Sequence, residues 1–145
     1  MMSDDVESLL SEARRARAQG DLAGARGGYE HVGELARSAG DGRLLAYALR
    51  HISDIARDDG RPADALASGQ EAVELYRSLA DAPSLDLANA LRVTALAWQA
   101  SARFGEASPV WREARDLYSQ AGVQAGVEEC DTSLERIARM GAEGR

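Results

Sequence analysis

Few residues of this 145-residue chain have the types and spacing that chemistry requires. His31 and His51 lie in separate helical segments, and neither has another histidine or a cysteine at metal-ligand spacing, so we interpret both as ordinary helical histidines. Cys130 falls on the apolar stripe of a helix without a nearby histidine to activate it, which predicts a small buried hydrophobe. No nucleophile, base and orienting group can be assembled from these residues, so the sequence predicts that the protein is not an enzyme.

The glycine-rich run from Gly24 to Gly28 is the nearest match to a phosphate-binding loop. It follows a helical segment rather than a strand, and it lacks the lysine and the Ser or Thr of such loops, so we predict that it is helical. All 17 basic residues of the chain are arginines, which excludes a phosphate-loop lysine and Schiff-base chemistry. We therefore expect no cofactor and no bound metal.

Acidic and aromatic residues invite two further functional interpretations. Glu128, Glu129 and Asp131 could be paired carboxylates, but three acids on the outer face of a terminal helix are typical of a solvated surface. Trp98 and Trp111 fall at packing positions, which favours a role in the core over stacking on a ligand.

Composition narrows the class of protein. The net charge of −7 argues against a general affinity for nucleic acid or for an anionic membrane surface, and no apolar run approaches the length of a membrane helix. The chain has one cysteine, so no internal disulfide is expected, and the segment after Met1 has no secretory leader pattern. We therefore expect a cytoplasmic location.

Apolar residues recur at spacings of three and four along most of the chain, which is the period of amphipathic helices. This pattern predicts helical hairpins at about 4–40, 42–81 and 84–122, followed by a single helix at about 124–140. Asp4 and Glu7 form a capping box at the first helix, and Ser84 is the expected cap of the fifth. No segment alternates apolar and polar residues over a useful length, so the predicted fold is all-α, in a single domain of residues 1–145.

Small residues recur at matched places in these hairpins. Ala25 and Ala65 open the second helices of the first two hairpins as Ala107 does in the third, and Tyr29 and Trp111 follow four residues after Ala25 and Ala107. The matching small residues of the first helices are Ala13, Ser53 and Ala95. Packing of small residues against large ones at fixed positions lets paired helices approach closely.

In these positions the chain resembles the tetratricopeptide repeats over about 120 of its 145 residues. The repeats are 40 and 42 residues apart, longer than the usual length of about 34, and in this they look like those of kinesin light chain and of bacterial peptide-sensing regulators. The resemblance implies a right-handed α-solenoid of three antiparallel helical hairpins. The last helix carries Val127, Cys130, Leu134 and Ile137 on one stripe, which predicts that it caps the open end of the stack.

Three positions depart from the pattern of the family. Gly69 stands where an aromatic residue is expected, and Trp98 is the large residue that we expect to fill the space. Gly33 takes an apolar position of the first repeat, and Ala102 replaces the turn glycine of the third.

The resemblance also implies a concave groove lined by the first helix of each hairpin. The residues that it places there, called the predicted groove residues below, are Arg14, Arg17, Tyr47, Arg50, His51, Arg57, Asn89, Arg92 and Gln99, with Asp54 and Leu96 among them. This row has five arginines and one acid, which favours an acidic or carboxylate-bearing partner segment held by forked hydrogen bonds. A simple solvated helix face is the alternative, because an exposed arginine needs no function.

These observations predict a non-enzymatic module that binds a protein or peptide. Two alternatives stay open. One is a structural role by self-association, in which the helix that carries Val6, Leu9 and Leu10 docks on another copy. The other is a regulatory or sensory module that binds a short peptide or a small anion in the groove.

Overall fold

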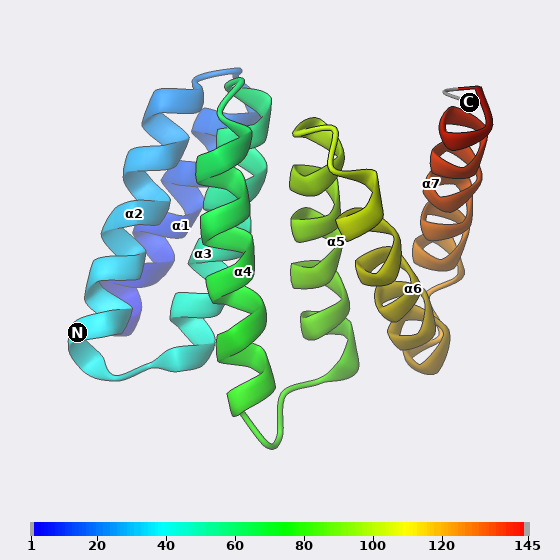
Figure 1. The fold of residues 1–145 in the computed structure, drawn as a ribbon. Helices are drawn as coiled ribbons and strands as arrows, with labels where there is room; N and C mark the ends of the chain where they lie inside the picture. Colours follow the sequence, from blue (N-terminus) through cyan, green and yellow to red (C-terminus); the bar gives the residue numbers. More distant parts are fainter. Residues whose placement is uncertain (1, 144–145) are drawn as a thin grey trace.

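Seven α-helices make up the secondary structure of residues 2–143, the part of the chain that this computed structural model describes, and this part contains no strand (Figure 1). They are α1 (Met2–Ala18), α2 (Leu22–Ala39), α3 (Gly42–Asp58), α4 (Pro62–Ser78), α5 (Ser84–Ala100), α6 (Phe104–Ala121) and α7 (Gln124–Glu143). The all-α prediction is confirmed for these residues.

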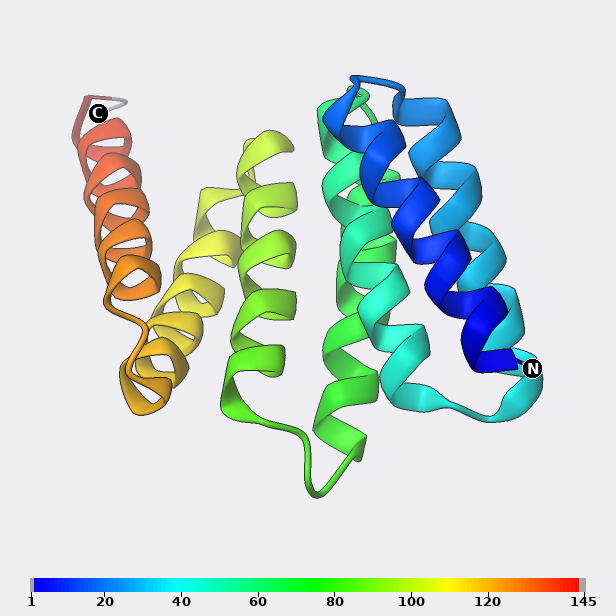
Figure 2. The same cartoon turned by 180° about the vertical axis from the view of Figure 1, so that it is seen from behind.

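Each helix packs against the next one along the chain, and α3 also contacts α5. Most of the links are two or three residues long, so consecutive helices run in opposite directions, and α1 and α7 lie at opposite ends of the row (Figures 1 and 2). The longest link joins α4 to α5 and begins where the backbone turns extended at Leu79. This order brings residues of α1, α3 and α5 to neighbouring places although they are far apart in sequence.

Aspartate side chains cap the N-terminal ends of two helices, but two other caps expected from the sequence do not form. The Asp21 and Asp41 carboxylates accept hydrogen bonds from the backbone N–H groups of Gly24 and Leu44, as N-caps do. The expected capping box at Asp4 is wrong, because α1 already begins at Met2. Ser84 is not a cap either, since it is the first residue of α5 and Pro83 precedes it without a side-chain bond.

The last helix is longer than its sequence pattern indicates. The pattern predicts an end near residue 140 and a frayed tail from Gly141, but α7 continues to Glu143. The rest of the expected tail, residues 144 and 145, lies outside the described part of the chain. The glycine-rich run from Gly24 to Gly28 is confirmed as helical, within α2.

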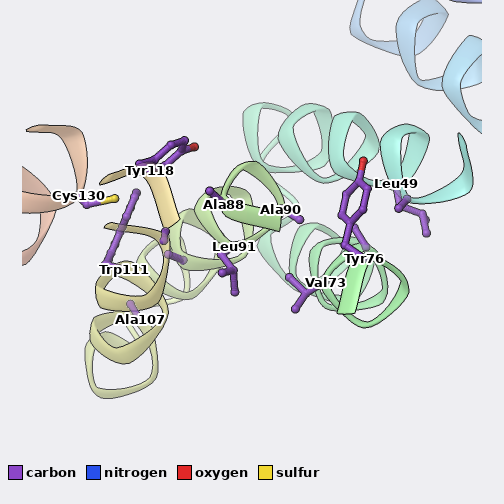
Figure 3. Packing of buried hydrophobic residues seen from close by; sticks show 14 of the residues in the cluster. Leu49, Val73, Tyr76, Ala88, Ala90, Leu91, Ala107, Trp111, Tyr118 and Cys130 are labelled. Atoms are coloured by element: carbon purple, nitrogen blue, oxygen red, sulfur yellow. The ribbon is translucent and has the colours of Figure 1, made fainter. Parts of the chain in front are cut away.

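The matched small residues lie in the centre of the packed helices. Every one of the set Ala13, Ser53, Ala95, Ala25, Ala65 and Ala107 is buried, with at most 1% of its surface exposed. Trp111 and Tyr29 are fully buried beside them, and Figure 3 shows Trp111 and Tyr118 between Cys130 on one side and Ala88 and Leu91 on the other. Trp98, in contrast, is half-buried at the edge of this core. Of the two tryptophans, only Trp111 fills the core as predicted.

Gly69 makes room for a neighbour, but the neighbour is not Trp98. A Cβ atom at Gly69 would lie 2.7 Å from the Thr94 Oγ1, 3.3 Å from the Thr94 Cα and 3.2 Å from the Ser53 Oγ. Thr94 is buried and donates its hydroxyl to the Ala90 carbonyl, and Ser53 donates to the Ala65 carbonyl. The backbone of α4 therefore lies against two small hydroxyl-bearing residues. A rule that pairs large residues with small ones in the sequence does not detect this contact.

The turn between α5 and α6 contains a left-handed residue that is not glycine. Ala102 has φ of 58°, where the equivalent turns use Gly20 at 80° and Gly60 at 74°. A Cβ atom disfavours this region by roughly 1 kcal/mol. We expect Ala102→Gly to raise the free energy of unfolding by about 0.5–1 kcal/mol in urea denaturation, and Ala67→Gly, at an exposed position in the middle of α4, to lower it by a similar amount. If Ala102→Gly lowered the free energy of unfolding, the Cβ atom of Ala102 would not be a source of backbone strain.

Candidate partner-binding surface

Two of the predicted groove arginines are neutralised at the end of α3. The Arg17 guanidinium of α1 donates to the Asp58 carboxylate at 2.7 Å. Arg57 lies 2.8 Å from the Asp54 carboxylate and 3.5 Å from that of Asp58. These residues form a network of two arginines and two aspartates without a net charge, so this end of the row has no excess of positive charge to offer a ligand.

Arg92 of α5 is held by a carboxylate of α7. Its Nε and Nη2 atoms donate to the two oxygens of Glu129 at 2.5 and 2.9 Å, and the two side chains are 31% and 37% exposed. These hydrogen bonds raise the pKa of Arg92 above its ordinary value, against the effect of burial. The interpretation of the α7 acids as a solvated surface is therefore wrong for Glu129. Asp131 is on the solvated surface as predicted, where it accepts a bond from Arg115 of α6 at 2.5 Å.

The two groove amides hold buried aromatic rings in place. The Tyr118 hydroxyl donates to the Asn89 side-chain oxygen at 2.7 Å, and the Trp111 indole N–H donates to that of Gln99 at 2.5 Å. Buried Tyr and Trp side chains need such partners for their polar tips. Asn89 and Gln99 therefore have a structural role, and only their amide N–H groups remain for another molecule.

The remaining predicted groove residues form one cluster around Tyr47, which we call the Tyr47 cluster: Arg14, Tyr47, Arg50 and His51, with Tyr29 beneath them. Arg14 donates to the Tyr47 hydroxyl at 2.8 Å, and the Arg50 guanidinium carbon lies 5.4 Å from the centre of the Tyr47 ring. Such a distance allows a cation–π contact.

The His51 ring packs against both tyrosine rings of this cluster. Its ring stacks on that of Tyr29 with centroids 4.7 Å apart, and it lies 4.6 Å from the Tyr47 ring in a tilted arrangement. The Arg50 Nη2 lies 3.2 Å from His51 Nε2, which accepts a hydrogen bond when the imidazole is neutral. Arg50 makes no ion pair with a described residue, so no carboxylate of the described side chains compensates its half-buried charge.

No protein-family model matches this chain, and no curated protein is detectably similar to it in sequence. The relation to the tetratricopeptide repeats therefore stays a resemblance that rests on the residue pattern. What the surface does must be argued from its own geometry and charge.

The other groups with reactive potential lie apart from this cluster. Cys130 is fully buried as predicted, and burial raises the pKa of its thiol to about 11, so the thiol is protonated at neutral pH. His31 is exposed on α2. No cluster of three or more metal-ligating side chains occurs among the described residues. Over the same part of the chain, every helix is too short or too polar to span a bilayer.

The described apolar side chains of α1 are largely covered. Val6 and Leu10 are buried and Leu9 is half-buried, whereas the self-association alternative requires them on the surface. Among residues whose side chains the structure describes, the exposed large hydrophobic residues are Leu85 and Met140, which lie on α5 and α7. Among the described side chains, the exposed apolar ones therefore do not favour this alternative.

The burial of His51 should make stability depend on pH. Burial and the charge of Arg50 lower the pKa of His51 to about 4, from its usual value of about 6.5. The unfolded chain then binds a proton that the folded chain does not, so the neutral imidazole's contribution is complete above pH 6.5 and is lost as the pH falls toward 4. Between pH 7 and 5 the parent should lose about 1–2 kcal/mol more stability than His51→Gln.

Urea unfolding at the two pH values measures this difference, and His31→Gln on the exposed face of α2 is the control. It should keep the pH dependence of the parent. If His51→Gln lost as much stability as the parent on acidification, His51 would not be the group responsible.

Proposed function

We propose that this protein is a non-enzymatic interaction module of the tetratricopeptide type. In this proposal α1–α2, α3–α4 and α5–α6 are the three antiparallel hairpins of a right-handed α-solenoid, and α7 caps its last hairpin. The face that α1, α3 and α5 share binds an acidic or carboxylate-bearing segment of a partner protein, and Arg50 is its main contact.

The observation that supports this proposal is the state of Arg50. Arg17, Arg57 and Arg92 all lie within 3 Å of a carboxylate of the same chain, whereas Arg50 lies against Tyr47 and His51 and pairs with no carboxylate among the described residues. Half-burial of an unpaired guanidinium costs free energy unless another group supplies the counter-charge. A carboxylate from a partner would supply it.

The surroundings of Arg50 limit its motion before a partner arrives. The Tyr47 ring lies under the guanidinium, the Arg14 bond fixes the Tyr47 hydroxyl, and His51 accepts a hydrogen bond from Arg50. A guanidinium held in one orientation loses less conformational entropy when it forms a forked pair with a carboxylate. Such a contact contributes about 1.5–3 kcal/mol when it is shielded from water. Arg14 adds a second positive charge at the hydroxyl end of the ring.

Selection from a random peptide library tests the proposal because it samples acidic, basic and apolar segments alike. We expect peptides that bind the parent protein to be enriched in Asp and Glu, and the same peptides to bind Arg50→Glu at least about tenfold more weakly, since 1.4 kcal/mol is a factor of ten. Arg112 of α6 is exposed and, among the described residues, makes no ion pair or side-chain hydrogen bond. Arg112→Glu is therefore the matched control, and it should bind as the parent does.

Arg77 and Arg115 are less suitable controls, although they lie on α4 and α6. Arg77 donates to Glu113 and Arg115 donates to Asp131, each linking two neighbouring helices. Charge reversal at these positions would disturb the packing of helices as well as the surface charge. Peptides without acidic enrichment, or equal losses in Arg50→Glu and Arg112→Glu, would show that Arg50 is not the contact.

A further inference from the structure

A pocket of about 370 Å³ lies next to the Tyr47 cluster. Its walls come from four helices that are distant in sequence: Leu10 of α1, Leu44 and Tyr47 of α3, Tyr76 of α4 and Asp86 of α5. Ligand pockets commonly occupy about 300–1,000 Å³. A pocket at the lower end of this range suits a single side chain of a bound segment rather than a whole cofactor.

The walls are apolar and aromatic. Leu10 and Tyr76 are buried, and Leu44 and Tyr47 are half-buried, so an aliphatic chain in the pocket would contact hydrocarbon and ring faces. Burial and the nearby Asp86 carboxylate raise the pKa of Tyr76 to about 12, so its phenol stays neutral. Neutral tyrosine rings attract cations to their faces.

The charged rim of the pocket is acidic. Asp41, Asp86 and Arg43 also line the pocket, so its lining has two carboxylates and one guanidinium. Arg43 lies 3.3 Å from the Asp81 backbone carbonyl and donates to it, and Asp41 caps α3 at the Leu44 N–H. Asp86 is half-buried and, within the described part of the chain, has no hydrogen-bond or ion-pair partner. The Asp86 carboxylate is therefore available as the partner of a cationic group.

We propose that this pocket binds the side chain of an arginine or lysine in the same partner segment whose acidic group contacts Arg50. The aliphatic stem lies along Leu10 and Leu44, and the cationic end lies between the tyrosine rings and the Asp86 carboxylate. Long basic side chains combine an apolar stem with a charged tip in this way. The inference rests on the proposed function and narrows the partner to a segment that carries an acidic residue beside a basic one.

Small probes test the pocket directly. Butylguanidinium has the stem and the charge of an arginine side chain, and butylurea has nearly the same shape without the charge. In ¹⁵N-labelled protein, butylguanidinium should shift the amide signals of Leu44, Tyr47 and Asp86 and should bind at least about threefold more tightly than butylurea. Equal affinities would overturn the proposal in favour of an uncharged apolar occupant, and no binding of either probe would overturn it outright.

Asp86→Asn should remove the preference for the charged probe while the fold is retained. Asp64 also lies in the first turn of its helix, α4, and is exposed, so Asp64→Asn matches the change in charge and helix position and should keep the preference. A preference that survives Asp86→Asn contradicts the assignment of Asp86. If acidic peptides still bind through Arg50 when the probes fail, only this inference is wrong; if they fail as well, the proposed function is wrong too.

Discussion

A protein that lacks residues 124–145 is expected to lose most of its stability. Cys130 and Ile137 of α7 are buried, and Val127 and Leu134 are partly buried, against a core that contains Trp111 and other residues of α6. At roughly 1.5–3 kcal/mol for each large apolar side chain when fully buried, their removal should cost on the order of 4–6 kcal/mol. This is a large fraction of the roughly 5–15 kcal/mol that keeps a domain folded. Urea denaturation and light scattering should show lower stability and association of the exposed face.

A charge variant separates the apolar contribution of α7 from its ion pairs. Glu129→Gln combined with Asp131→Asn removes the carboxylates that contact Arg92 and Arg115 but keeps the apolar stripe. Ion pairs at the surface contribute little to stability, so the double variant should remain folded and close to the parent in stability. A truncated protein that stays monomeric and melts at the parent temperature would contradict the role of α7 as a cap.

Side chains at Gly69 are expected to be strongly destabilising. An alanine Cβ there would approach the Thr94 Oγ1 to 2.7 Å and its Cα to 3.3 Å, and because the second contact is backbone, the helices must separate. We expect Gly69→Ala to lower the free energy of unfolding by about 1–3 kcal/mol and Gly69→Phe to lower it by at least about 3 kcal/mol. The aromatic residue that the repeat pattern favours at this position would then be the most damaging one.

Gly27 provides a control that should change stability in the opposite direction. It lies inside α2, is exposed, and a Cβ atom there would meet nothing within 4 Å. Gly27→Ala should therefore raise the free energy of unfolding by about 0.5–1 kcal/mol through helix propensity. Urea unfolding of the two alanine variants measures both effects, and Gly69→Ala at or above the parent stability would show that α4 and α5 can separate without cost.

The helices and the core could be predicted from the sequence because their signals are local and periodic. Ala65 and Trp111 are buried where the repeat places them, and the glycines at 20 and 60 form the expected turns. The contact of Gly69 with Thr94 could not be predicted in the same way. It depends on the distance between α4 and α5, which is set by packing across helices rather than by the pattern within one.

The candidate site was predicted less completely than the fold. Sequence position placed Arg92 and Arg50 one repeat apart as equivalents, but Arg92 is paired with Glu129 and Arg50 is not. The difference arises because α7 packs on α6 and brings its acids to α5 and α6. One interhelical signal was present in the sequence and was missed: Arg37 and Arg77 are 40 residues apart, their partners Glu71 and Glu113 are 42 apart, and both pairs form.

The affinity of an acidic peptide for Arg50→Glu, measured by calorimetry beside the parent and Arg112→Glu, tests the central claim most directly. The peptide is the tightest binder from the library selection, and circular dichroism confirms that each variant is folded. The account predicts a loss of at least about tenfold for Arg50→Glu, a smaller loss at higher salt, and parental affinity for Arg112→Glu. Parental affinity for folded Arg50→Glu would contradict the claim that the uncompensated arginine of the Tyr47 cluster binds the partner.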